Sequence, residues 1–577
     1  MRFIDYQRKS SFRGFGLILL LGATTAWGAD PLPSSGPIVP ELMPLAHAMT
    51  NFMGPRNFEA GTIAVLKDDR LVLRQGFGWR DRAKTVVIQP DSMMRLASVS
   101  KTLTGSAITK LVDSGKLAYS TPIYALLGIQ PLGGTLGDAR ITKITVQQLL
   151  DHTAGWDRNV GPVFDPVFDT IQISQEAGLN HPAEPTDVIR WMLAKPLQNA
   201  PGTVNSYSNF GYDLLGRVIE KVSGKSYVDY LRQDLFGPVG ITNIIQSRSR
   251  PQDRDPREIW YASGPLERSA IDFPSNVLAT FPDGGGYMES FDAFGGMAAS
   301  AVELCHYAQH FFVSSRVRPT AGTWSWNYVF YGSLPGTTAV IHQDLHLTSS
   351  STNALEFAAL FNNRTEGSAG EDNEVIHAEI VNAASGITSW PVAAGGEIQW
   401  AVTGTNVFKN VGTVSLQLRR TGGNSKAVKV SYTTSSQTAS STDYTPQSGI
   451  LTFGTGETTQ TVVIPITNTA LTEPAKTFTV ELTSASGGAW LGNQFTTTVR
   501  ILSPPRLAGE AAGAADGHFT LRVTGAEGAS LRFESSDDLS HWQSLGTISQ
   551  VTSNLQWKDP SAPPALGRRY YRAVVVE

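Results

Sequence analysis

Two hydrophobic patterns divide the chain near residue 385. Before this point, apolar residues recur at helical spacing, as in the run through Ile108, Leu111 and Val112. After it, apolar residues alternate with serine and threonine, as in 414–418 and 428–432. Alternation with a period of two is typical of half-buried strands, whereas spacings of three and four indicate amphipathic helices. The pattern predicts an α/β (α+β) domain followed by all-β modules.

The first region predicts a sheet built from both of its ends. Apolar runs at 62–66 and 71–73 flank a charged turn and predict a β-hairpin. Further strands are expected at 337–340 and 355–360. Between these ends, the spacing predicts a helix from about Ser98 to Val112, a mainly helical block over 120–285 and another helix from about Ala301.

The second region predicts two β-rich modules. Strands are expected at 414–418, 428–432, 461–466 and 477–482, and then at 519–523, 531–534 and 570–574. Pro504 and Pro505 mark a linker between the two groups. The predicted domains are a signal peptide at 1–29, an α/β (α+β) domain at 30–385, a β-sandwich at 386–503 and a C-terminal β-rich module at 504–577.

Composition narrows the possible partners. With 46 Lys and Arg against 50 Asp and Glu, the net charge of −4 gives no electrostatic footprint for nucleic acid or for an anionic membrane. Basic residues precede the apolar run 16–21, and small residues follow around Ala29, which predicts export. That run is shorter than the ~20 residues that span a bilayer. The expected location is the periplasm, the cell surface or the medium, with no stable membrane span.

The single cysteine, Cys305, lies in an apolar run and is interpreted as a core residue. It cannot form an intramolecular disulfide, so core size alone must hold the exported protein together.

Candidate chemistry begins at Ser98 and Lys101. Residues three apart share one helix face, and a lysine that is kept neutral can accept a proton from a serine. Such a pair alone is a weak signal, because a serine that caps a helix beside a solvated lysine gives the same pattern. However, no other lysine here has a serine three residues before it, and only Tyr207 among 16 tyrosines is followed two residues later by asparagine, at Asn209.

These motifs resemble those of the serine β-lactamase and penicillin-binding-protein superfamily, in its class C, D-alanyl-D-alanine carboxypeptidase and family VIII esterase branch. Matching segments occur in family order over about 340 residues: 98–101, 149–155, 201–202, 207–209, 295–297 and 332–337. The resemblance implies a β-lactamase-like fold with an inserted helical block. The resemblance implies no cofactor or metal. The sequence also has no closely spaced set of His, Cys and carboxylate residues that would suggest a zinc site.

The resemblance also implies roles for individual residues. Ser98 would be the nucleophile, Lys101 and Tyr207 would share the proton transfers, and Asn209 would hold their geometry. Which of Lys101 and Tyr207 accepts the Ser98 proton stays open. The backbone N–H groups of Ser98 and Ser333 would form the oxyanion hole. His152 is interpreted as a structural residue near the site, because no Gly-x-Ser-x-Gly nucleophile elbow exists in the chain.

The third motif departs from the family pattern. Where the family carries Lys or His, then any residue, then Gly, this chain reads Phe330, Tyr331 and Gly332. We expect these three residues to contact substrate. An aromatic ring cannot pair with a carboxylate, so the change favours uncharged esters or amides over β-lactams and peptides ending in D-Ala-D-Ala.

The β-rich region resembles a Calx-β domain through 420–423, 443–444, 448–453 and 456–457. In that family acidic residues can bind calcium, and here Asp443 and Glu473 remain. Residues other than Asp or Glu occupy the other expected positions, at Lys409, Asn468, Ala475 and Lys476. Because calcium needs six to eight oxygen ligands, we expect none to bind. Residues 506–577 resemble a small fibronectin-like module.

The sequence therefore predicts an exported serine hydrolase that forms an acyl-enzyme on Ser98 and acts on an ester or amide. The alternative is a non-catalytic surface protein that binds peptidoglycan or another ligand. In either case, the β modules would contact a cell-wall or surface component.

Overall fold

The computed structural model describes residues 32–576, except 37, 69, 162–164, 242, 263, 315–324, 347–353, 368–369, 391–394, 422, 469–473, 493, 511–519, 526–529, 550–554 and 560–568. The predicted signal peptide and Glu473 lie outside the described residues.

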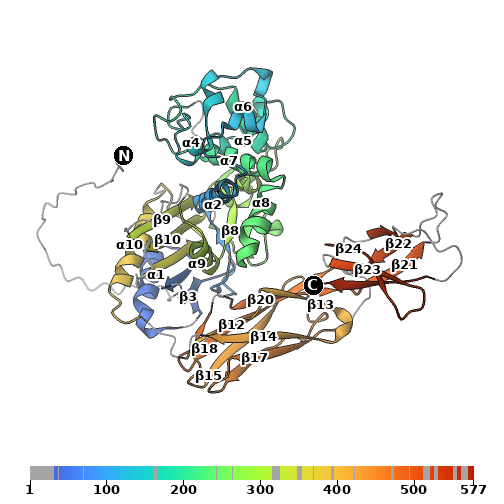
Figure 1. Ribbon diagram of the computed structural model, residues 1–577. Coiled ribbons are helices and arrows are strands. Elements are labelled where there is room, and N and C mark those ends of the chain that lie inside the picture. Colours follow the sequence, from blue (N-terminus) through green and yellow to red (C-terminus); the bar gives the residue numbers. More distant parts are fainter. Residues whose placement is uncertain are drawn as a thin grey trace, which may run out of the picture. The chain divides into compact units, whose positions relative to one another are not determined.

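An antiparallel sheet of six strands, in the order β1-β3-β2-β11-β10-β9, forms the base of the first region (Figure 1). Its strands are β1 (Ser34–Ser35), β2 (Ala60–Lys67), β3 (Arg70–Gly78), β9 (Ser325–Leu334), β10 (Thr337–His346) and β11 (Leu355–Phe361). The predicted hairpin is β2–β3, and the late strand β11 pairs with β2. The prediction of a sheet built from both ends of the region is thus confirmed.

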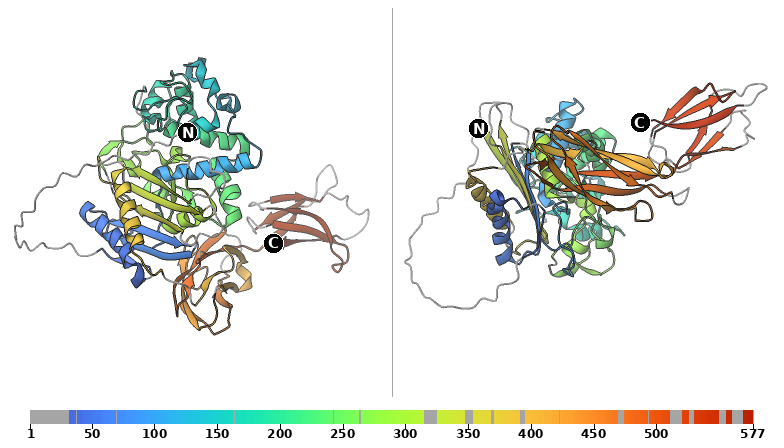
Figure 2. Two further views of the ribbon diagram at one scale, coloured as in Figure 1. Left: turned by 60° about the vertical axis from the view of Figure 1, so that its left-hand side comes forward. Right: turned by 90° about the horizontal axis from the view of Figure 1, so that it is seen from below.

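Helices cover both faces of this sheet. On one face, α1 (Met43–Arg56) and α10 (Glu371–Ser385) pack against each other (Figure 2). On the other, α9 (Ala301–His310) contacts β2 and β11. Cys305 of α9 is a buried free thiol, as predicted for a core residue.

The inserted block is mainly helical, as expected. The helix predicted from Ser98 is α2 (Ser100–Asp113), preceded by one 3₁₀ turn, η2 (Ala97–Val99). It packs against α7 (Asn209–Ser223). The other helices are α3 (Ile123–Leu127), α4 (Val146–Leu150), α5 (Thr170–Glu176), α6 (Pro185–Leu193) and α8 (Tyr227–Tyr230). Short strands β4 (Met94–Arg95), β5 (Ile244–Gln246) and β8 (Met297–Ala299) pair together, as do β6 (Leu266–Arg268) and β7 (Leu278–Thr280).

The next region is a sandwich of two sheets, in the orders β17-β14-β12-β19 and β13-β20-β18-β15-β16. The strands are β12 (Glu397–Trp400), β13 (Gly404–Phe408), β14 (Thr413–Thr421), β15 (Val428–Ser436), β16 (Ser448–Phe453), β17 (Thr459–Pro465), β18 (Lys476–Ser486), β19 (Trp490–Leu491) and β20 (Thr496–Leu502). Side chains of β14 alternate strictly between exposed and buried, because one face packs on the core and the other meets water.

The last region contains two three-stranded sheets, β21-β22-β25 and β24-β23-β26. Their strands are β21 (Arg506–Glu510), β22 (Thr520–Thr524), β23 (Ser530–Ser536), β24 (Gln543–Ile548), β25 (Leu555–Lys558) and β26 (Tyr570–Val576). Across the described part of the chain, no helix has the length and apolar content needed to cross a bilayer. The same residues contain no group of three or more His, Cys, Asp or Glu side chains placed to hold a metal ion.

Candidate active site

Ser98 lies in a strained turn between the short strand β4 and helix α2. The preceding residue, Ala97, has φ of 45°, in the left-handed region that residues with a side chain rarely adopt. Strand β9 passes close to this turn at Gly332. A Cβ there would lie 2.1 Å from the carbonyl oxygen of Leu96, so only glycine allows the approach. The turn leaves Ser98 half-buried, on the wall of a cavity.

Lys101 is fully buried one turn after Ser98 on α2. Its Nζ lies 3.1 Å from Ser98 Oγ, 2.6 Å from Asn209 Oδ1 and 2.8 Å from the Phe294 carbonyl oxygen. Burial holds the pKa of Lys101 well below its ordinary value; the anion of Asp165 opposes that shift and the cation of Arg158 adds to it. A lysine in this environment can accept a proton.

Tyr207 is the second proton-transfer candidate beside Ser98, and Lys101 Nζ lies 4.9 Å from the centre of its ring. Its hydroxyl donates to Ser98 Oγ at 2.7 Å. Burial raises the pKa of Tyr207, although the hydrogen bond with Ser98 partly opposes that shift. The phenol is therefore protonated at neutral pH. The Arg158 guanidinium lies 5.0 Å from the centre of its ring, and the His152 ring centre lies 4.7 Å away.

His152 positions the segment that carries Tyr207. Its carbonyl oxygen accepts from the Ser206 N–H at 2.8 Å, and its Nδ1 accepts from the Ser208 N–H at 3.2 Å. With Nδ1 used in this way, His152 fits the predicted structural role.

Asp165 and Arg158 belong to the site but were not predicted from the sequence. Asp165 Oδ2 accepts from Asn209 Nδ2 at 2.7 Å and lies 3.6 Å from Arg158 Nη1. Burial raises the pKa of Asp165 to about 6, against the opposing effects of Asn209, Arg158 and Lys101. The bond from Asn209 Nδ2 fixes the amide so that Oδ1 faces Lys101. One sequence feature could have identified Asp165 as a candidate site residue. Its carboxylate interrupts an apolar run that continues with Pro166, Val167 and Phe168.

The register of β9 supports the predicted oxyanion hole. Strands β9 and β10 are joined by the two-residue turn Pro335-Gly336, and Leu334 pairs with Thr337 beside it. In such a hairpin the pair next to the turn exchanges hydrogen bonds, so Ser333, one residue back, directs its N–H away from β10. Because β9 is an edge strand, that N–H faces the open side, where η2 packs. The Ser98 N–H lies in the first turn of its helix, where no intrahelical acceptor exists.

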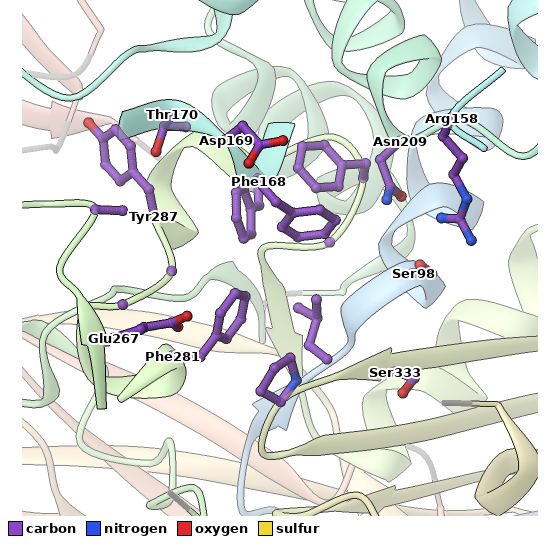
Figure 3. Close-up of a pocket in the computed structure, with 18 of the residues that line it drawn as sticks. Ser98, Arg158, Phe168, Asp169, Thr170, Asn209, Glu267, Phe281, Tyr287 and Ser333 are labelled. Atoms are coloured by element: carbon purple, nitrogen blue, oxygen red, sulfur yellow. The ribbon is translucent and has the colours of Figure 1, made fainter. Parts of the chain in front are cut away.

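A cavity of about 1100 Å³ opens over Ser98 (Figure 3). Phe330 and Tyr331 line it, as expected for the third motif, and so does Ser333. Gly332, the third residue expected to contact substrate, is not among the residues that line the cavity and instead packs against the turn before Ser98. Phe330 packs partly on the hydrophobic core, and Tyr331 makes an edge contact with the His377 ring at 5.8 Å. The volume remains open with Phe330 in place, so this ring does not fill the site.

Comparison with known sequences shows which protein families match this chain. The sequence model of the beta-lactamase family matches residues 45–351, more than half of the 577 residues. The Calx-beta domain model matches residues 394–505. Protein flp of Staphylococcus aureus is 29% identical over 182 residues, which are 32% of this chain and 34% of that protein. Penicillin-binding protein 4* of Bacillus subtilis is 27% identical over 224 residues, 36% of this chain and 44% of that protein.

The matched stretch thus spans less than half the length of either relative. Among solved structures, D-amino acid amidase from Ochrobactrum anthropi has a TM-score of 0.43 at 17% identity, over 60% of this chain and 99% of that chain. The octameric penicillin-binding protein homologue from Pyrococcus abyssi has a TM-score of 0.41 at 17% identity, over 83% of this chain and 97% of that chain.

Proposed function

The chain belongs to the beta-lactamase family, and we propose that it is a serine hydrolase that transfers an acyl group to Ser98. The observation that carries the proposal is the position of Ser98 Oγ between two proton-transfer groups, Lys101 Nζ at 3.1 Å and the Tyr207 hydroxyl at 2.7 Å. Both distances allow direct proton transfer.

The hydrogen bonds of Lys101 favour it as the base. A neutral amine has two N–H groups and one lone pair. Asn209 Oδ1 and the Phe294 carbonyl oxygen can only accept, so they take the two N–H groups and leave the lone pair for the Ser98 hydroxyl. The Tyr207 hydroxyl donates to the same Ser98 oxygen, which a phenolate could not do. Lys101 then accepts the proton and Tyr207 supplies one.

The proposed steps balance as follows. Ser98 Oγ loses its proton to Lys101 and attacks the carbonyl carbon, while the N–H groups of Ser98 and Ser333 stabilise the oxyanion. The bond to the leaving group then breaks, and the leaving oxygen or nitrogen takes a proton from Tyr207. The Lys101 ammonium then returns its proton to the Tyr207 phenolate through a water molecule, because the acylated Ser98 Oγ carries no proton to relay; Lys101 Nζ lies 4.9 Å from the centre of the Tyr207 ring. Water repeats the sequence on the acyl-enzyme and releases the acid.

The third motif supports an uncharged substrate. Phe330 stands where the family pattern has Lys or His, and a ring cannot neutralise a substrate carboxylate. We propose a carboxylesterase-like activity on esters or amides, in an exported protein whose β modules contact a cell-wall or surface component. The alternative, a non-catalytic binding protein, is less favoured because Ser98 lies open to the cavity and holds both proton-transfer contacts.

Intact mass after incubation with a fluorophosphonate tests this proposal. We expect one adduct on the mature protein and none on Ser98→Ala, with turnover of p-nitrophenyl butyrate lost in the same variant. Ser100→Ala, two residues away on α2, is the matched control and should still be labelled. An unlabelled wild-type protein without ester turnover would refute the proposal and favour the binding protein.

A further inference from the structure

The cavity over Ser98 has a wall of four phenylalanine rings. Ring centres of Phe291 and Phe294 lie 4.9 Å apart, Phe168 meets Phe291 edge-on at 5.2 Å, and Phe281 lies 6.3 Å from Phe291. All four line the cavity. Phe291 and Phe294 are almost fully buried, whereas Phe168 keeps 37% of its surface exposed. An exposed ring held by edge contacts to buried rings offers a face for another ring to pack on.

The wall of phenylalanine rings extends away from Tyr207, which donates a proton in the proposed mechanism. Figure 3 shows Ser98, Asn209 and Arg158 at one end, Phe168 and Phe281 in the middle, and Tyr287 and Glu267 at the far end. Arg158 stacks on the ring of Tyr207, which protonates the leaving group in the proposed steps. The leaving group therefore lies at the Arg158 end, and the acyl group lies along the rings.

The charged side chains that line the cavity are of both signs. Asp169 lies beside Phe168 and Glu267 lies at the far end, whereas Arg158, Arg268 and Arg364 line the same cavity. Because both signs are present, the rings rather than the charges distinguish one acyl group from another.

We propose that the enzyme selects esters or amides whose acyl group carries an aromatic ring. This inference rests on the proposed acyl transfer at Ser98 and names its substrate class. The cavity of about 1100 Å³ is large enough for such a group, since pockets for drug-sized ligands measure about 300–1,000 Å³. A short alkanoyl group has no ring to pack on this wall.

Esters with one leaving group separate the acyl preference from the chemistry. We would measure kcat/KM for the p-nitrophenyl esters of butyric, hexanoic and 4-phenylbutyric acids. The expected kcat/KM for 4-phenylbutyrate is about 30-fold above butyrate and above hexanoate, because burying a ring adds differential binding.

Variants then assign the preference to the wall. Phe168→Ala should lower the ratio of kcat/KM for 4-phenylbutyrate to kcat/KM for butyrate about tenfold. Phe312→Ala is the matched control, because Phe312 is half-buried and lies outside the cavity lining.

The outcomes separate the two proposals. If Ser98 turns over butyrate but 4-phenylbutyrate is no better than hexanoate, or if Phe168→Ala leaves the ratio unchanged, the aromatic preference is overturned while acyl transfer stands. Failure of every ester together with failure of fluorophosphonate labelling would overturn both proposals.

Discussion

Two lysines in this chain meet a carboxylate in different ways. In the Calx-beta domain, Lys476 Nζ contacts Asp443 Oδ1 directly at 2.7 Å. In the active site, Asn209 stands between Lys101 and Asp165, with its Oδ1 on Lys101 and its Nδ2 on Asp165. Lys101 is fully buried, whereas the Lys476 side chain keeps 28% of its surface exposed. Lys476 therefore contacts its carboxylate directly, whereas Lys101 contacts the Asn209 amide, which separates it from the carboxylate of Asp165.

The difference separates a structural charge pair from a reactive amine. Direct contact favours the charged forms of both partners, and the pKa of Asp443 is lowered even though burial opposes that shift. A neutral amide in between weakens the attraction, so burial dominates at Lys101 and its pKa falls. The amide spacer is what suits Lys101 to accept a proton.

The largest expected effect comes from the nucleophile itself. Ser98→Ala should lower kcat for p-nitrophenyl butyrate by at least about 10⁴-fold, because the bond to the acyl group cannot form. Steady-state kinetics measure it, and circular dichroism checks that the variant is folded. Turnover within tenfold of the wild type would place the chemistry elsewhere.

Removing the amine is the next largest change. Lys101→Met keeps the length and apolar stem but has no lone pair on nitrogen, so kcat should fall by about 10³-fold. Lys110→Met on the same helix is the control and should retain activity. An unaffected kcat in Lys101→Met would show that Tyr207 is the base instead.

Asn209→Asp would give Lys101 the direct contact that Lys476 has. A carboxylate at 2.6 Å would keep the amine protonated, and kcat/KM at pH 8 should fall by about 100-fold. Asn205→Asp, four residues earlier and exposed, controls for the added charge. A fall of equal size in both variants would argue for a general charge effect and against the spacer.

A smaller effect concerns stability and Asp165. Its pKa of about 6 lies above its ordinary 3.8, so folding disfavours the ionised carboxyl. The stability that the protonated form contributes is complete below about pH 4 and is lost as pH rises through about 6. Relative to Asp165→Asn, the wild-type free energy of unfolding should therefore fall by up to about 3 kcal/mol between pH 4 and pH 7.5.

Denaturant unfolding at several pH values measures this trend. A difference between wild type and Asp165→Asn that stays constant from pH 4 to pH 7.5 would mean that Asp165 does not titrate in this range.

The smallest effect on activity should come from the other lysine. Lys476→Met should leave kcat unchanged and destabilise the Calx-beta domain by about 1–2 kcal/mol, because the buried Asp443 loses its cation. Asp443 Oδ2 also accepts from the Ser440 N–H at 2.9 Å, so adding Ca²⁺ should leave Tm of the wild type unchanged. A rise in Tm with Ca²⁺ would contradict the expectation that no calcium binds.

Local patterns explain why part of the site could be predicted. Ser98 and Lys101 are one helical turn apart, and Tyr207 and Asn209 are two residues apart, so the sequence itself holds each pair together. Strand alternation likewise predicted β14, and two apolar runs around a charged turn predicted the hairpin β2–β3. The inserted position of the helical block came from the family resemblance, since periodicity alone does not fix topology.

The unpredicted parts depend on contacts between distant segments. Asp165 meets Asn209 across 44 residues, and no spacing rule relates the two. The phenylalanine wall joins Phe168 to Phe281 and Phe291, more than 100 residues later. None of these rings follows a period that would mark a common face, so only the folded chain brings them together.

The central claim, that Lys101 is a neutral base held by an amide spacer, is tested most directly by the pH dependence of fluorophosphonate labelling at Ser98. Rates would be measured by intact mass for the wild type and Asn209→Asp, with Ser98→Ala as background. We predict half-maximal labelling of the wild type well below pH 10.5, the ordinary pKa of lysine, and a shift to higher pH in Asn209→Asp. Half-maximal labelling of the wild type near pH 10.5, or at the same pH in both proteins, would contradict the account.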